Sequence, residues 1–241
     1  PGVEAVLLTF SPQGLEFYTK PAKISPVCVS AFYSKSNFCT YKVSQTVKHV
    51  VQKSQLDDLK KRIAKDVEFL EITEGTEGFV AGGRRTYKTG GGCDFEINLD
   101  SLDESLISVT DMSTLRWNLQ VRTASQHFAD NVNFFDDTVK WIQLSVKPKL
   151  LEFTGIRDTG TTSKKVNQMI NSEFAGEYHA LFNKKLLKGV TAARDIHKAL
   201  CISFNITESD FPVHFMYEMG QDHPQSHFSV YIAPCNAEDR D

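Results

Sequence analysis

The stretch from residue 139 to residue 155, "VKWIQLSVKPKLLEFTG", decides the fold of this chain. Apolar and polar residues alternate on both sides of the Pro148-Lys149 step, and such alternation around a turn is typical of a β-hairpin. Three further segments have the same shape, starting at Ala5 ("AVLLTFSPQGLEFYT"), Val67 ("VEFLEITEGTEGFVAG") and Lys198 ("KALCISFNITESDFPVHFMYE"). The sequence therefore predicts four antiparallel hairpins.

The spacing of the hairpins indicates an internal repeat. Their first residues lie 62, 72 and 59 residues apart, and the first-to-third and second-to-fourth distances are 134 and 131 residues. A fixed period of this kind indicates a duplicated architecture. We expect two similar halves, each built from two similar quarters.

Three of the hairpins follow a stretch with helical periodicity. Residues 54–66 place Leu56, Leu59 and Ile63 on one face, and residues 123–137 and 183–193 show similar apolar spacing. The hairpin at Ala5 has no such stretch before it, so we expect roughly twenty residues with a first strand and helix to be absent, an estimate from the length of a quarter. The expected fold class is α+β, with helices on one face of antiparallel sheets.

Composition limits the possible functions. The chain has 241 residues, 41% of them hydrophobic, and a net charge of -3. No apolar run is long enough to span a membrane and no secretory signal is visible, which favours an intracellular protein. The five cysteines include no Cys-x-x-Cys spacing, so neither a disulfide framework nor a zinc site is expected.

Motifs for catalysis are scarce. The seven histidines are scattered, and no Gly-x-Ser-x-Gly or His-Glu-x-x-His pattern occurs. The Gly-rich stretch "AGGRRTYKTGGGC" lacks the Lys-Ser or Lys-Thr that a phosphate-binding loop carries after its last glycine. We expect no enzymatic activity, no cofactor and no metal.

Positive charge on two of the predicted helices is the main functional signal. The cations are Lys60, Lys61, Arg62 and Lys65 on the first helix, and Lys184, Lys185 and Lys188 on the third. Equivalent helices from repeated units could present these side chains on one surface that follows a phosphate backbone without reading bases. The alternative is that they are the solvated backs of ordinary surface helices.

Three stretches carry a resemblance to a known family. The ending "DFPVHFMYEMGQDHPQSHFSVYIAP", the early "SPQGLEFYT" and the stretch "CDFEINLDSLDESLISVTDM" resemble the DNA sliding clamps of the proliferating cell nuclear antigen (PCNA) type. The likeness extends over essentially the whole chain in order and spacing. It implies two similar domains of two repeats each, with helices inside and sheets outside a ring.

The resemblance also implies a function. Sliding clamps of this family are rings, usually homotrimers, that encircle duplex DNA and recruit polymerases and other replication or repair proteins, in the nucleus or in a viral replication compartment. In that frame the seven cations named above bind DNA. The predicted second helix departs from the family pattern, since it offers Asp130 and Asn133 where basic residues are usual.

The resemblance implies two protein-binding regions as well. A pocket for short partner peptides would be formed by Leu106, Ile107, Val109, Pro212, Tyr231, Ala233 and Pro234. Subunit contacts are expected at two edge strands, through Cys93, Phe95, Ile97, Val166 and Ile170.

The predicted division is an N-terminal domain at 1–98, a connecting loop at 99–113 and a C-terminal domain at 114–241.

Two other functions remain open at this point. One is a subunit of a heterotrimeric checkpoint-type clamp, which has the same fold and unlike partners. The other is an uncharacterised α+β enzyme, which would require a pocket with convergent titratable groups.

Overall fold

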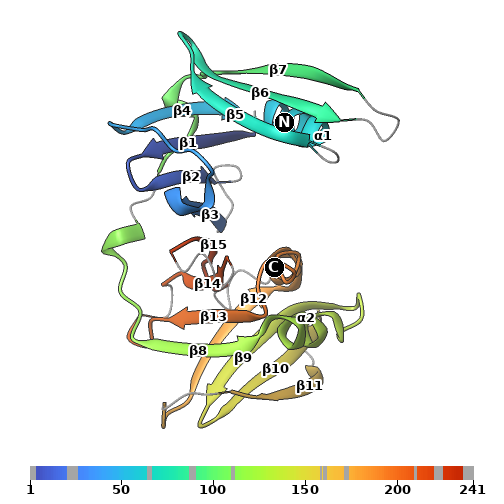
Figure 1. Ribbon diagram of the computed structural model, residues 1–241. Coiled ribbons are helices and arrows are strands. Elements are labelled where there is room, and N and C mark those ends of the chain that lie inside the picture. The colour runs from blue at the N-terminus through green and yellow to red at the C-terminus, as the bar shows by residue number, and fades with distance from the viewer. Residues whose placement is uncertain are drawn as a thin grey trace. The chain divides into compact units, whose positions relative to one another are not determined.

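The computed structural model (Figure 1) describes residues 4–20, 27–63, 67–86, 91–109, 112–157, 159, 162–170, 174–208, 211–219 and 225–235. The chain divides into two compact units. The first comprises residues 1–25 and 34–110, and the second comprises residues 26–33 and 111–241. The division falls between residues 110 and 111. All of strand β3 (Val27–Ser34) except its last residue belongs to the second unit, where the strand pairs with β15 (His227–Ile232).

The first unit contains six strands and one α-helix in its described part. Strands pair in the orders β4-β1-β2 and β5-β6-β7. The elements are β1 (Ala5–Ser11), β2 (Gly14–Thr19), η1 (Lys35–Asn37), β4 (Val47–Gln52), α1 (Lys53–Ile63), β5 (Val67–Glu74), β6 (Gly78–Thr86), β7 (Gly92–Asp100) and η2 (Glu104–Leu106). Helix α1 packs on β4 and β7 through Leu59 and, less completely, Leu56 and Ile63.

The second unit contains two larger sheets and two α-helices. Strands pair in the orders β3-β15-β14-β13-β8 and β11-β10-β9-β12. Its other elements are η3 (Met112–Thr114), β8 (Leu119–Ala124), α2 (Ser125–Asn133), β9 (Val139–Lys147), β10 (Leu150–Arg157), β11 (Thr162–Met169), β12 (Tyr178–Asn183), α3 (Lys184–Thr191), β13 (Ala199–Phe204) and β14 (Val213–Glu218). Helices α2 and α3 pack against each other.

The local predictions from sequence are confirmed. All four hairpins are present as the antiparallel pairs β1–β2, β5–β6, β9–β10 and β13–β14. The three helical stretches form α1, α2 and α3, each shorter than its sequence pattern. Alternation and helical periodicity are local properties, which is why the sequence alone was sufficient here.

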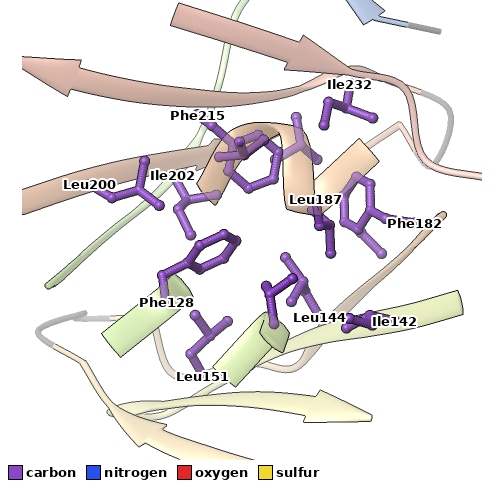
Figure 2. Packing of buried hydrophobic residues seen from close by; sticks show 14 of the residues in the cluster. Phe128, Ile142, Leu144, Leu151, Phe182, Leu187, Leu200, Ile202, Phe215 and Ile232 are labelled. Carbon is purple, nitrogen blue, oxygen red and sulfur yellow. The ribbon is translucent and has the colours of Figure 1, made fainter. Parts of the chain in front are cut away.

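The core of the second unit lies where its helices meet its two sheets. Figure 2 shows Phe128 of α2, Leu187 of α3 and Phe215 of β14 among the buried side chains that fill this space, and all three have no exposed surface. The first unit has a smaller core, whose most buried members include Leu8, Val51 and Leu99. Removal of this apolar surface from water is the main stabilising contribution.

The predicted fold class was wrong. The described residues are mostly antiparallel sheet, with 53% strand, 18% helix and only three α-helices, rather than the predicted α+β layering with helices on one face of the sheets. Strands dominate because each hairpin brings further strands of six to nine residues, whereas the α-helices have only 8 to 11 residues. The described part of this chain also forms no closed ring of inner helices and outer sheets.

Candidate nucleic-acid interface

The predicted cations of α1 lie on its solvent-exposed side. Lys60, Lys61 and Arg62 are exposed, whereas Leu59, on the apolar face of the same helix, is only 7% exposed. Lys61 donates to Asp58 Oδ1 at 2.7 Å, and this hydrogen bond raises the pKa of Lys61. Within the described residues, Lys60 and Arg62 have no ion pair. The remaining predicted cation, Lys65, lies outside the described residues.

The three lysines of α3 have different environments. Lys185 is exposed, and Lys188 is exposed with its Nζ 3.8 Å from Asp137 Oδ1. Lys184 is only 4% exposed, and its Nζ donates to the carbonyl oxygens of Phe135 and Asp136 at 2.7 and 2.6 Å. The ammonium group of Lys184 therefore donates hydrogen bonds to carbonyl oxygens just beyond the C-terminal end of α2. A cation is favourable at this end of a helix. In this conformation its ammonium is not available to a phosphate.

Lys184 and Lys185 form a matched pair for mutation. We expect Lys184→Met to lower the free energy of unfolding of the second unit by about 1–3 kcal/mol, because the carbonyl groups of Phe135 and Asp136 lose a charged donor and the first of these hydrogen bonds is buried. Lys185→Met should change it by less than about 0.5 kcal/mol, since an exposed substitution removes no packing. Urea unfolding monitored by tryptophan fluorescence measures the free energy of unfolding of the second unit. The two tryptophans of the chain, Trp117 and Trp141, both belong to that unit. Equal losses for the two variants would contradict the buried role of Lys184.

Helix α2 contributes no lysine or arginine to the surface. Its exposed residues are Gln126, His127, Asp130 and Asn133. Asp130 accepts a hydrogen bond from Gln126 at 2.7 Å. The packed pair of helices therefore has a cationic member, α3, and a weakly acidic member, α2. Any contact with phosphate in this unit would be centred on α3.

The predicted peptide-pocket residues are divided between the units. Leu106, Ile107 and Val109 belong to the first, where Leu106 and Val109 are 49% and 55% exposed and Ile107 is buried. Pro212, Tyr231, Ala233 and Pro234 belong to the second. The pocket itself stays a prediction.

Sequence reasoning missed an aromatic cluster around two of these residues. The rings of His214 and Tyr231 stack with centroids 4.5 Å apart, and the Trp117 ring lies 5.1 Å from that of His214. The indole Nε1 of Trp117 donates to the carbonyl oxygen of Pro212 at 3.0 Å. His214 and Tyr231 are directly opposite in the β14–β15 register, so knowledge of that pairing would have been needed to find the stack.

Burial lowers the pKa of His214. Desolvation, with a smaller contribution from the charge of His227, lowers the pKa of His214 from 6.5 to about 4. Its Nε2 lies 2.9 Å from the hydroxyl of Ser229, which is fully buried. A neutral imidazole can accept or donate in this contact, whereas an imidazolium can only donate.

The sign of the pH effect follows from the lowered pKa. The unfolded chain binds a proton at His214 below about pH 6.5 and the folded chain only below about pH 4, so folding stability falls as the pH decreases through this window. By pH 5 we expect a loss of about 2 kcal/mol relative to pH 7. The measurement is urea unfolding at both pH values for the natural chain and for His214→Phe, which keeps a ring against Tyr231 without a titrating group. The prediction fails if both proteins lose the same stability.

The predicted subunit-contact residues lie in or directly after the edge strands of two sheets. Cys93, Phe95 and Ile97 are in β7, and Val166 is in β11 with Ile170 directly after it. Both strands are edge strands among the described residues. Phe95 and Ile170 are 9% and 8% exposed and pack in the cores of their own units. Pairing of two subunits through these edge strands would use backbone groups more than the side chains of Phe95 and Ile170. This subunit contact stays a prediction.

One side-chain arrangement resembles a hydrolase triad. His179 Nδ1 lies 2.8 Å from Ser145 Oγ, and His179 Nε2 lies 3.5 Å from Glu177 Oε1. Ser145, however, has no exposed surface. A serine that no substrate carbonyl can approach is not a nucleophile, so we interpret the trio as a structural cluster of Ser145 on β9, His179 on β12 and Glu177 directly before β12.

Two comparisons with known proteins find no match for this chain. No protein-family model matches the chain, and no curated protein sequence matches it. Among the described residues, no helix is long and apolar enough to cross a membrane. In the same part of the chain, no group of three or more His, Cys, Asp or Glu side chains is arranged to hold a metal ion.

Proposed function

We propose that the protein binds duplex DNA without reading its sequence and serves there as a processivity and recruitment factor, as the sliding-clamp resemblance implies. The observation that supports this proposal is the charge of two helices. Helix α1 exposes Lys60, Lys61 and Arg62, and α3 exposes Lys185 and Lys188 with no acidic residue of its own. Exposed cations on helices can contact phosphates without contacting base edges.

Ion pairing within the protein limits how many of these cations are free for DNA. Lys61 is paired with Asp58, and Lys188 is near Asp137. Lys60, Arg62 and Lys185 are free of ion pairs within the described residues. We therefore assign the main phosphate contacts to these three residues, with Lys188 as a weaker member.

The test is the salt dependence of DNA binding. Three phosphate contacts per chain predict that log K falls against log salt with a slope of about -2.7, because each contact releases counterions from the duplex. Fluorescence anisotropy with labelled duplexes of two unrelated sequences measures both slope and sequence preference. A slope near zero, or a strong preference for one sequence, would contradict the proposal.

A further inference from the structure

The turn between β9 and β10 has an unusual backbone. Leu150 pairs with Lys147, so the turn consists of Pro148 and Lys149 alone. Lys149 has a φ of 59°, and among the described residues it is the only residue other than glycine with a positive φ. A side chain in this left-handed region is strained because its Cβ crowds the backbone, and glycine is the usual residue at the second position of such a turn. The chain therefore has a lysine at a position where glycine would relieve strain.

An exposed apolar side chain lies beside this strained lysine. Met169, the last residue of β11, is 75% exposed, the highest value among the large hydrophobic residues that the structure describes. It lies opposite Leu150 in the β10–β11 register, and the amide of Ile170 donates to the carbonyl oxygen of Lys149 at 3.1 Å. Backbone strain and an apolar side chain in water, both unfavourable, therefore occur at one place. We call Lys149, Leu150 and Met169 the tip surface.

The two apolar members of the tip surface lie on the face of the sheet that points away from the core. Side chains alternate between the two faces of a strand. The neighbours Leu151 and Gln168 are 0% and 8% exposed, and Leu151 belongs to the core of the second unit. Leu150 and Met169 must then point to the opposite face, where Leu150 is half-buried and Met169 is exposed.

The tip surface also has a cation that the protein itself does not pair. Lys149 is exposed and has no ion pair within the described residues. The carboxylates of Glu152 and Glu177 are held by Lys147, whose Nζ lies 3.6 and 3.1 Å from them. Glu152 also lies 3.5 Å from the Nζ of Lys165. The charge complementary to the tip surface is therefore negative.

We propose that the tip surface binds a short segment of a partner protein in which a carboxylate side chain stands next to an apolar one. The carboxylate pairs with Lys149, and the apolar side chain packs on Met169 and Leu150. Methionine suits this contact because its long, unbranched side chain adapts to different apolar partners. The strained backbone holds the ammonium group of Lys149 beside the apolar pair. No residue of the tip surface belongs to α1 or α3, so this inference does not depend on DNA binding.

The test uses two labelled peptides and the whole chain. The probe is the fluorescein-labelled peptide Gly-Ser-Asp-Leu-Asp-Leu-Ser-Gly, and its control has lysine in place of both aspartates. Fluorescence anisotropy at low ionic strength should give a dissociation constant below about 1 mM for the probe and no binding of the control. The probe should also shift the methyl NMR signal of Met169, one of four methionines, which Met169→Leu identifies.

Two variants separate binding from folding. Lys149→Gly removes the ammonium group and relieves the strain, so it should weaken probe binding about fivefold without loss of stability to urea. Met169→Gln keeps the length of the side chain but removes the apolar contact, and it should also weaken binding about fivefold. The matched control is Lys140→Ala, at the other end of β9, which should leave probe binding unchanged.

Several results would overturn the proposal. They are equal binding of the two peptides, no probe binding at about 1 mM, or an unchanged probe affinity in Lys149→Gly or in Met169→Gln. Sedimentation of the natural chain checks for contact between copies. Self-association that Met169→Gln abolishes would also overturn the proposal, because the tip surface would then bind a second copy of the chain.

Discussion

Reversing four cations, with Lys60→Glu, Arg62→Glu, Lys185→Glu and Lys188→Glu combined, is expected to weaken binding to duplex DNA by at least about 100-fold. Two unit charges 4 Å apart interact with about 1 kcal/mol in a water-like environment. Losing three or four such attractions therefore costs about 3 kcal/mol, which corresponds to roughly 100-fold in the dissociation constant. All four side chains are exposed, so the folded structure should tolerate the change. Anisotropy at about 100 mM salt, where surface charges more than about 10 Å apart are screened, measures the loss.

The control for this experiment has the same change in net charge at other places. Lys42, Lys48, Lys140 and Arg157 are also exposed but lie in loops or strands. Their combined reversal to glutamate should weaken binding by less than about fivefold, because only close charges act strongly on a phosphate. If both variants lose affinity equally, net charge rather than α1 and α3 governs binding, and the proposed interface is wrong.

Features that depend on neighbouring residues were predicted well from the sequence. The hairpin at 139–157 was visible because its apolar residues alternate and a Pro-Lys step separates the two runs. Helix α1 was visible because Leu56, Leu59 and Ile63 recur at helical spacing. The fold class was not predicted correctly, because in the described residues the strands that complete the sheets far outnumber the three short α-helices.

Features that depend on distant pairings were not predictable in the same way. Lys184 looks like its neighbours Lys185 and Lys188 in the sequence, yet it is buried because the carbonyl groups of Phe135 and Asp136 lie beside it in the fold. The pairing of β3 with β15 joins residues about 200 positions apart, and no local pattern encodes it. The other lysines of the predicted site are exposed, and their contact with DNA stays a prediction, whereas Lys184 is buried and serves the structure.

The replacement Phe128→Ala is expected to lower the free energy of unfolding of the second unit by about 3–5 kcal/mol, the usual cost of removing a fully buried phenylalanine. Phe128 has no exposed surface, and its ring lies 5.6 Å from that of Phe153 and 5.9 Å from that of Phe215. It lies between α2 and the sheets in the cluster that Figure 2 shows. The cavity would remove contacts with both sheets of the unit at once, because Phe153 belongs to β10 and Phe215 to β14.

A control with the same chemistry is available at the end of the same helix. Phe134 is 52% exposed, so Phe134→Ala should cost less than about 1 kcal/mol by the same reasoning on buried apolar area. Urea unfolding followed by tryptophan fluorescence reports the second unit, whereas circular dichroism also reports the first, and the two curves need not coincide in a chain of two units. Equal losses for the two variants would show that Phe128 does not connect the two sheets. A shift of the dichroism curve without a shift in fluorescence would contradict the assignment of this core to the second unit.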